Sequence, residues 1–430
     1  MSCKSQSAAT KAEAARSLVP KLRFPGFSKP WAYGSLSEVL TEHKLKNTAG
    51  RHVFSVSMEH GIVNQIELLG RSYAAADTSH YTIGRRYDVV YTKSPLKAFP
   101  FGIVKQCKFD GEAALSPLYG VFTPPNPHLG LMIEAYFESP NRSKDFLSPL
   151  CQKGAKNTLQ ITNTTFLSGR LPLPTEPAEQ QKIAECLSSL DELIAVQARK
   201  VEALKTHKKG LMQQLFPREG ETQPRYRFPE FQNAGEWEET TLGSVARLRN
   251  GYAFKSAEYV KDGPYQIITI ANVQQGNLTI ESTKRIAALP PDIQKHQVLD
   301  LGDILISMTG NVGRVCLVTS ENLLLNQRVG KLVPDTIQFA FFYQLLQRDN
   351  FRSIMQLKAA GGAQGNLSAG DITEYPFRVP TKPSEQQKIA DCLSSLDTLI
   401  AAETQNLEAL KNHKKGLMQQ LFPSPEEVEA

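Results

Sequence analysis

Cysteine and histidine are the residues of this chain best suited to nucleophilic or metal chemistry, and their spacing argues against both. The six cysteines form no CxxC pair, so we expect neither a zinc site nor a disulfide framework. Free cysteines of this kind indicate a protein from a reducing compartment. The eight histidines form no HExxH pair. Cys186 and Cys392 are expected to be packing residues. His207 and His413 are expected to be solvated near a helix C-terminus, or to contact a phosphate or a partner.

Motifs that would hold a nucleotide or carry out methyl transfer are also missing. No GxxxxGK[ST] occurs, and the glycine-rich stretch 361–370 lacks the lysine of a phosphate-binding loop. The PPNPH stretch at 124–128 superficially resembles an amino-methyltransferase motif, but the residue order is wrong. We therefore predict that the chain is not an enzyme, has no catalytic residues and binds no metal or cofactor itself.

Composition places few limits on the partner. The chain has 430 residues, 41% of them hydrophobic, and a formal net charge of +6, which permits a polyanionic partner without requiring one. The N-terminus has no signal-peptide pattern, and no apolar run is long enough to cross a bilayer. We expect a cytoplasmic protein without membrane contact.

A long repeat dominates the sequence. Residues 179–217 and 385–423 align without a gap at a shift of 206, and 30 of the 39 positions are identical. In both copies apolar residues recur at steps of mostly three, four and seven, which predicts a helix with one apolar stripe. About 37 residues give a rod of roughly 55 Å. The helix-packing residues are Ile183, Leu187, Leu190, Ile194, Val201, Leu204, Leu211, Leu215, Ile389, Leu393, Leu396, Ile400, Leu407, Leu410, Leu417 and Leu421.

So narrow a stripe on so long a rod requires a partner helix, and the nearest candidate is the other copy. We predict that the two helices pack as an antiparallel coiled coil with pseudo-twofold symmetry. The alternative is that each helix packs only on its own domain. Pro177 and Pro383 are expected just before the helices.

The repeat extends into the globular parts. Arg23, Trp31 and Leu36 recur as Arg227, Trp237 and Leu242, whereas the middles, about 40–150 and 250–350, do not align by eye. β-branched runs at 265–273 and 303–308 predict strands, and 139–150 and 334–357 predict helix in part. We predict an α+β fold with two strand-cored domains. The expected division is a tail 1–20, domain 21–173, helix 174–217, linker 218–225, domain 226–379, helix 380–423 and tail 424–430.

These repeats resemble the specificity subunit of type I restriction–modification enzymes. EQQKIA…LSSLD…LEALK…KKGLMQQLF occurs twice, with Val201 in place of the Leu of LEALK in the first copy, and LGDILISMTGNVGR (301–314), NQR (326–328) and GGAQGNLS (361–368) add to the resemblance. YDVVYTK (87–93), FGIVK (101–105) and LSPLYGVF (115–122) are similar to another branch of the same domains.

The resemblance implies a DNA-binding chain with two target recognition domains. Each would read one half of a split, asymmetric double-stranded DNA site around a spacer of about five to eight base pairs, with the helices as a ruler. The helices would also dock two modification (methyltransferase) subunits, which carry S-adenosylmethionine, and restriction (endonuclease/translocase) subunits would join with ATP and Mg. The two alternatives are a coiled-coil adaptor without DNA binding, and a self-contained nuclease or methyltransferase.

The resemblance also suggests which side chains read DNA, because Asn and Gln suit adenine and Arg suits guanine. Lys208 and Lys209 are expected to support DNA binding or partner docking without regard to sequence. The candidates for DNA contact are Arg85, Arg86, Lys93, Ser94 and Lys97 in the first domain, and Thr309, Asn311, Arg314, Asn326, Gln327, Arg328 and Gln364 in the second.

Overall fold

The computed structural model describes residues 19–153, 159–361 and 365–423. The chain forms two compact units: Met1–Ala198 with Gln405–Ala430, and Arg199–Thr404. Both unit boundaries fall inside a long helix. The seven-part division made from the sequence therefore describes globular and helical segments, whereas contacts group each globular segment with parts of both helices.

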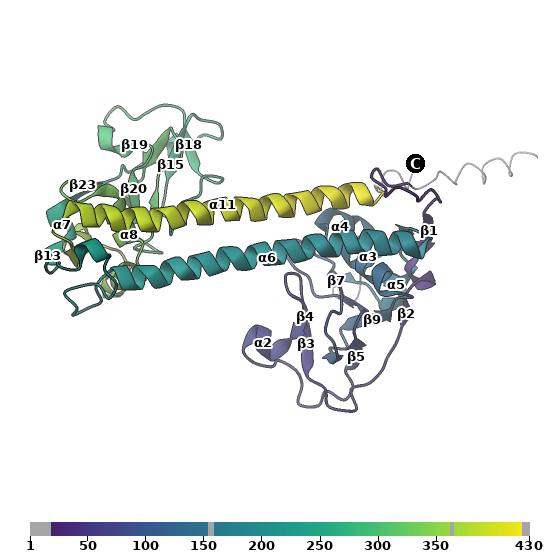
Figure 1. The fold of residues 1–430 in the computed structure, drawn as a ribbon. Coiled ribbons are helices and arrows are strands. Elements are labelled where there is room, and N and C mark those ends of the chain that lie inside the picture. The colour runs from purple at the N-terminus through teal and green to yellow at the C-terminus, as the bar shows by residue number, and fades with distance from the viewer. Residues whose placement is uncertain (1–18, 154–158, 362–364, 424–430) are drawn as a thin grey trace, which may run out of the picture. The chain divides into compact units, whose positions relative to one another are not determined.

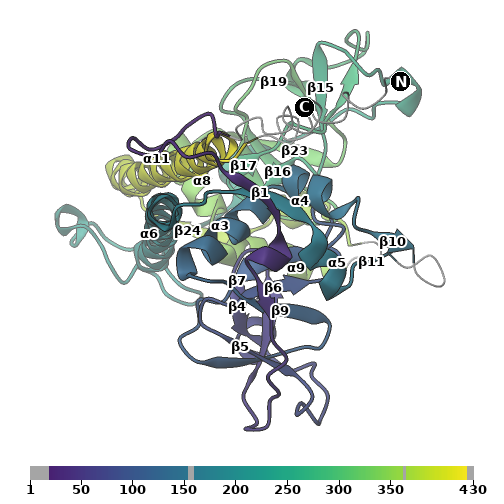
Figure 2. The same ribbon diagram turned by 90° about the vertical axis from the view of Figure 1, so that its right-hand side faces the viewer.

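The first unit is built on two four-stranded sheets, with strand orders β2-β9-β6-β7 and β4-β3-β8-β5, and a two-stranded β1-β12 sheet. Its strands are β1 Ala32–Ser35, β2 Thr41–Glu42, β3 Val53–Ser57, β4 Gly61–Asn64, β5 Thr82–Arg85, β6 Val89–Thr92, β7 Ile103–Gln106, β8 Glu112–Leu115, β9 Tyr119–Thr123, β10 Gln152–Lys153, β11 Leu159–Gln160 and β12 Arg170–Leu173. The shorter helices are α2 Gln65–Leu69, α3 Pro127–Phe137, α4 Pro140–Leu147 and α5 Asn163–Ser168, and a 3-10 turn covers Leu36–Glu38 (Figure 2).

The second unit has sheets ordered β14-β23-β20-β21 and β18-β15-β22-β19, a β13-β24 pair and a β16-β17 hairpin. Its strands are β13 Glu238–Thr241, β14 Ala246–Asn250, β15 Tyr265–Ile268, β16 Val273–Gln274, β17 Asn277–Leu278, β18 Lys284–Ile286, β19 Val298–Leu299, β20 Ile304–Ser307, β21 Val315–Leu317, β22 Leu323–Leu325, β23 Val329–Pro334 and β24 Pro376–Val379. Its shorter helices are α7 Leu242–Val245, α8 Phe339–Leu346, α9 Asp349–Ala360 and α10 Ala369–Thr373, with 3-10 turns at Pro229–Phe231, Ser256–Glu258 and Lys295–Gln297.

The two units share one strand topology, which the unaligned middles of the sequence did not reveal. Within the first sheet of each unit, the strand that comes first in the chain pairs with the one that comes last, which pairs with a central strand: β2-β9-β6 and β14-β23-β20. In each unit the second sheet contains one parallel pair, β3 with β8 and β15 with β22, between antiparallel neighbours. Strands that are equivalent by topology can therefore be compared even where their residues differ.

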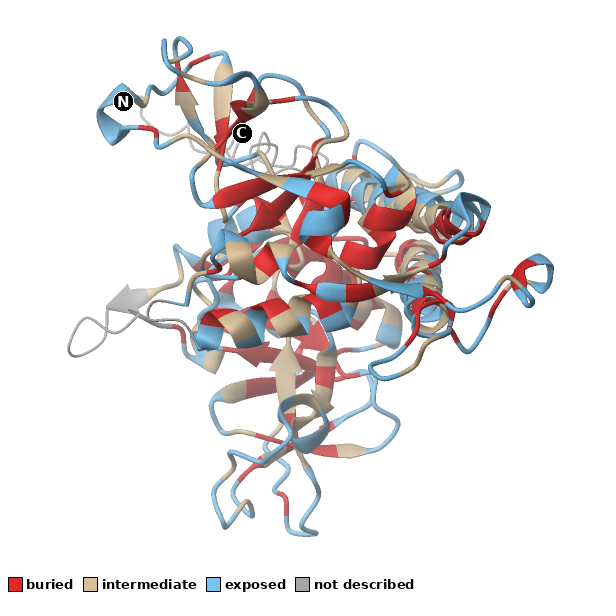
Figure 3. Ribbon diagram, turned by 90° about the vertical axis from the view of Figure 1, so that its left-hand side faces the viewer, coloured by how far each residue is buried: buried red, intermediate tan, exposed pale blue. Residues whose placement is uncertain are grey.

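Apolar strand sequences account for the position of the cores. Every residue of β6, β20 and β22 is buried, as expected of strands covered on both faces. In Figure 3 buried residues gather on strands and on the inner faces of helices, whereas loops and outer helix faces are exposed. The predicted α+β class is confirmed, as are the strands at 265–273 and 303–308 and the helices within 139–150 and 334–357.

The repeated segments form the two longest helices among the described residues, α6 Pro177–Leu215 and α11 Pro383–Leu421, of 39 residues each (Figure 1). At 1.5 Å per residue each is about 58 Å long. Our placement of Pro177 and Pro383 just outside the helices was wrong, because each helix begins at its proline. Proline suits that position, since its φ is already helical and the first N–H of a helix has no partner within it.

The repeated RFP motifs hold the starts of these helices. Arg227 donates from Nε and Nη2 to the two carboxylate oxygens of Glu385, at 2.7 Å each, and this pair is buried. Arg23 binds Glu179 in the same way, at 2.6 and 2.7 Å. A carboxylate in the first turn also suits the positive end of the helix dipole.

None of the sixteen predicted stripe residues is exposed. Ile183 and Leu187 belong to the core of the first unit, and Ile389 and Leu393 to that of the second. Within the second unit Lys200 binds Glu403 and Lys208 binds Asp397, so in this unit the segments of α6 and α11 run in opposite directions. No helix in the described ranges combines the length and apolar character needed to span a bilayer.

Candidate nucleic-acid interface

In the second unit three of the predicted reading segments meet at one edge of the β14-β23-β20-β21 sheet. Ser307 and Val329 form the last pair of the β20-β23 ladder. Just beyond it, the Met308 N–H donates to the carbonyl of Arg328 at 3.1 Å. The next residue, Thr309, forms a β-bridge with Asn366. The loops 309–314 and 326–328 and the segment at 365–366 are therefore neighbours in space.

Hydrogen bonds with Ser307, the last residue of β20, fix the conformation of the loop 309–314. The Ser307 hydroxyl donates to the carbonyl of Asn311 at 2.6 Å, and the Gly313 N–H donates to the carbonyl of Ser307 at 2.9 Å. Gly313 has φ +74°, and a Cβ there would lie 2.7 Å from that of Met355, so only glycine fits. A fixed turn with Asn311 exposed at its tip can present an amide to a base edge.

The predicted residues at this edge differ in how free their side chains are. Asn311, Gln327 and Arg328 are exposed, and their side chains make no hydrogen bond or ion pair with any described residue. Arg314 is half-buried and donates from Nη1 to Oε1 of Gln274, so it would have to exchange that bond for a base. The Asn326 side-chain oxygen accepts the backbone N–H of Arg328 at 3.3 Å. Gln364 lies outside the described residues.

Tyr252 belongs to the same edge and was not predicted from the sequence. Its N–H donates to the carbonyl of Leu325 at 2.8 Å, and its carbonyl accepts from the N–H of Gln327 at 3.0 Å. The preceding Gly251 permits this contact, because a Cβ there would lie 2.2 Å from the Asn326 carbonyl oxygen. The sequence pattern that could have indicated Tyr252 is a glycine, Gly251, followed by aromatic residues at alternate positions, Tyr252 and Phe254.

Lys93, Ser94 and Lys97 lie at the corresponding edge of the first unit. The β6-β9 ladder ends with Thr92 opposite Tyr119, so Lys93 and Leu118 come next, where Met308 and Arg328 stand in the second unit. Lys93 lines a small hollow with Tyr91 and Phe101, and desolvation lowers the pKa of its ammonium. Leu118, whose side chain is 66% exposed, was not predicted from the sequence.

Arg85 is the last residue of β5 and Arg86 follows it, so both precede β6, whereas Lys93 follows the other end of β6. Arg85 pairs with Glu112 at 3.3 Å, and Arg86 pairs with Asp110 at 3.2 Å. The structure therefore does not gather the five candidates of the first domain at one place. Lys93, Ser94 and Lys97 fit the edge that is equivalent to the loop 309–314, and the arginine pair does not.

Lys208 and Lys209 also differ from each other in the structure. Lys208 Nζ lies 2.6 Å from Asp397 and is 13% exposed, so it is part of the packing between α6 and α11 in the second unit. Lys209 is exposed and pairs with the exposed Asp349 at 2.8 Å. Only Lys209 remains available for a contact outside the chain.

Two of the described cysteines, Cys107 and Cys316, are fully buried. Burial raises the pKa of the Cys107 thiol and raises that of the Cys316 thiol to about 12, which leaves both protonated. In the described ranges no three His, Cys, Asp or Glu residues are grouped closely enough to hold a metal ion. The exposed loops at the sheet edges are the described feature best suited to contact a partner.

Comparison with known proteins gives this arrangement a context. Residues 110–206 and 234–412 match the family described as type I restriction modification DNA specificity domain. The chain is 28% identical over 275 residues to the type I restriction enzyme MjaVIII specificity subunit of Methanocaldococcus jannaschii, covering 61% of this chain and 63% of that protein. It is 26% identical over 279 residues to the putative MjaX specificity subunit of the same organism, covering 63% and 62%. The alignments thus span less than two thirds of each relative.

A solved structure supports the fold. The S subunit of a type I restriction–modification system from M. genitalium superposes with a TM-score of 0.58 at 16% sequence identity, over 95% of this chain and all of that one.

Proposed function

This chain belongs to the type I restriction modification DNA specificity family, and on that premise we propose that it selects the DNA sequence on which a type I restriction–modification complex acts. Each unit reads one half of a split, asymmetric site. Methyl transfer and cleavage belong to other subunits, and this chain contributes recognition and assembly.

One structural observation carries this proposal beyond the family match. The two units have the same strand order, yet the equivalent edge presents Lys93 and Leu118 in the first and Met308 and Arg328 in the second. A shared scaffold with different side chains at the same edge suits two modules that read different sequences in the same way. Two modules with a shared scaffold also account for why the globular parts keep their outer motifs and differ in the middle.

The long helices suit the role of spacer and dock. We propose that α6 and α11 pair along their stripes as an antiparallel coiled coil and fix the distance between the half-sites. Repeated helices present two similar surfaces, which fits two copies of one modification subunit. S-adenosylmethionine would then be bound by those subunits, and ATP and Mg by the restriction subunits.

The test is adenine methylation of a randomised DNA library by the chain reconstituted with its modification subunits, read by methylation-sensitive long-read sequencing. We expect a motif of two unlike halves around a spacer of about five to eight base pairs. A continuous palindrome would contradict two different reading units. No dependence of methylation on sequence, with no salt-dependent DNA binding, would favour the adaptor function instead.

A further inference from the structure

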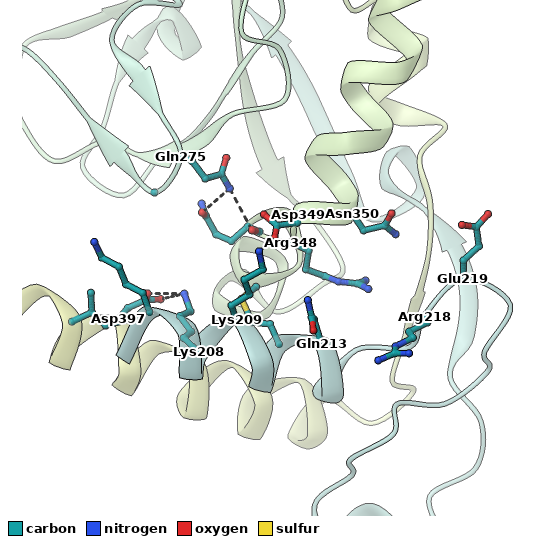
Figure 4. Close-up of a pocket in the computed structure, with 15 residues that line it drawn as sticks. Lys208, Lys209, Gln213, Arg218, Glu219, Gln275, Arg348, Asp349, Asn350 and Asp397 are labelled. Carbon is teal, nitrogen blue, oxygen red and sulfur yellow. Dashed lines mark hydrogen bonds and ion pairs between the residues drawn. The ribbon is translucent and has the colours of Figure 1, made fainter. Parts of the chain in front are cut away.

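A hollow of about 580 Å³ opens in the second unit. Figure 4 shows it between the C-terminal part of α6, the chain that follows α6, the turn between β16 and β17, and the start of α9. Five cationic side chains line it, three from α6 and two from segments outside that helix. They are Lys205, Lys208, Lys209, Arg218 and Arg348.

The positive charge of this hollow is only partly balanced. Lys208 is paired with Asp397, and Lys209 with Asp349. Lys205 and Arg218 are exposed and form no ion pair or hydrogen bond through their side chains with the residues that the structure describes. A third acid, Glu219, lines the rim, and in Figure 4 its carboxylate points away from Arg218.

Arg348 adds a half-buried charge without a carboxylate partner in the described chain. Its Nη2 donates to the carbonyl of Pro217 at 3.0 Å, and its guanidinium lies 4.9 Å from the centre of the Phe216 ring. Burial lowers the pKa of Arg348, because neighbouring atoms remove water from an uncompensated cation. A guanidinium has five N–H donors, so several are left for a ligand.

The first unit has the same arginine in a closed arrangement. Arg142, 206 positions earlier, donates to the carbonyls of Met418, Gln419 and Phe422 at 2.8, 3.4 and 3.4 Å. Three of its donors therefore bind the end of α11, whereas Arg348 uses one on the segment after α6. The repeat thus holds one arginine engaged with a helix end and one that faces a hollow.

We propose that this hollow binds one phosphate group of the DNA backbone, with Arg348, Arg218 and Lys205 as its donors. This rests on the proposed function. Guanidinium and ammonium groups are the usual donors to phosphate in DNA-binding proteins. No described residue that lines the hollow is aromatic, so nothing there would stack on the base of a free nucleotide.

The hollow also lies beside the reading edge. The backbone N–H of Val315 donates to Oε1 of Gln275 on its rim at 3.3 Å, and the Gly276 N–H donates to the Val315 carbonyl at 2.8 Å. Val315 follows Arg314 directly in the loop predicted to read bases. A duplex whose bases meet that loop would bring its backbone close to the rim, which fits a contact that fixes position without reading sequence.

The experiment compares the wild-type chain with the double variant Lys205→Ala/Arg218→Ala, each reconstituted with its modification subunits. Both side chains are exposed, so the fold should be kept, as circular dichroism will verify. DNA affinity is measured from 50 to 200 mM KCl. We expect a salt slope less steep by about one in the variant, because one phosphate fewer is neutralised, and an unchanged sequence preference. Lys411→Ala is the matched control, since Lys411 is the repeat copy of Lys205 and pairs with Glu408 at 2.8 Å.

A second arm locates the contact on the DNA. Single phosphates across the site are replaced by neutral methylphosphonates. One position should weaken binding of the wild-type chain and have no effect on the double variant. Inorganic phosphate, added at constant ionic strength, should compete with DNA more strongly for the wild type if the hollow also accepts a free ion. No difference in competition, together with the changed slope, would assign it to the DNA backbone alone.

Two results would overturn the proposal. One is an unchanged salt slope and an unchanged methylphosphonate profile in the double variant. The other is loss of modification subunits from the double variant at unchanged slope, which would place an acidic protein segment in the hollow. Failure of the proposed function is seen separately, because the wild-type complex would then show no sequence preference in methylation.

Discussion

The ammonium of Lys208 lies 2.6 and 2.7 Å from the two carboxylate oxygens of Asp397. In the first unit Lys414 lies 2.6 Å from Asp191. Lys414 is the repeat copy of Lys208, and Asp397 is the copy of Asp191. Each unit therefore contains the same lysine–aspartate pair between its segments of α6 and α11.

Changing Lys208→Met should destabilise the second unit by about 1 kcal/mol, because Asp397 loses a short ion pair that is only partly screened by solvent. Urea unfolding measures this. Lys209→Ala is the control, since the Lys209–Asp349 pair is exposed and should contribute little. The exchange Lys208→Asp with Asp397→Lys should recover part of the loss. Equal stability of wild type and Lys208→Met would show that the pair does not hold the helices.

Acid should weaken the first unit more than the second. Burial alone would raise the pKa of Glu138, but the ion pairs with Lys414 and Lys105 outweigh it and lower that pKa below its usual value. The ionised carboxylate therefore stabilises the folded state above about pH 5, and this stabilisation is lost as the pH falls through the lowered pKa. Gln344, 206 positions later, lies beside the corresponding ion pair of the second unit, where its amide donates to Asp397 at 2.7 Å, and it cannot titrate.

The variant Glu138→Gln tests this. It should be less stable than the wild type at pH 7 and lose less stability between pH 7 and pH 4. Urea midpoints at the two pH values measure both changes. An undiminished acid response in the variant would place the sensitivity at another carboxylate.

Gln327→Ala should relax one half-site only. The Gln327 side chain is exposed at the reading edge and has no partner in the described chain, and a lost bidentate base contact costs about 1–3 kcal/mol of discrimination. Methylation of a randomised library by the reconstituted complex measures it, with Gln232→Ala, an exposed glutamine elsewhere in the same unit, as control. A change in both halves, or in neither while binding is retained, would mean that Gln327 does not read the site.

Leu118 should read a thymine in the half-site of the first unit. An exposed apolar side chain beside Lys93 suits the thymine methyl group, the apolar feature of the major groove. Replacing each thymine of that half-site with deoxyuridine removes the methyl alone. One replacement should weaken binding of the wild type and leave Leu118→Ala unaffected. If all replacements act equally on both proteins, Leu118 does not touch a thymine.

The sequence by itself determined the features that depend on local pattern. The stripe from Ile183 to Leu215 and its copy predicted two helices, because periodicity and proline placement act within a segment. The apolar run at 303–308 likewise predicted the buried strand β20. The family followed from the same repeated residues, and the matching family model confirmed it.

Only the tertiary structure decided which distant residues meet. The equivalence of Lys93 and Leu118 with Met308 and Arg328 follows from strand pairing. It could not be predicted from the sequence, because the middle parts of the two globular domains do not align and strand pairing depends on residues far apart in the chain. For the same reason the sequence grouped Arg85 with Lys93, although Arg85 ends β5, before β6 begins, and Lys93 follows the end of β6. The partner of Lys208, 189 residues away, likewise depends on how two helix segments pack, because local pattern shows that a face is apolar but not what covers it.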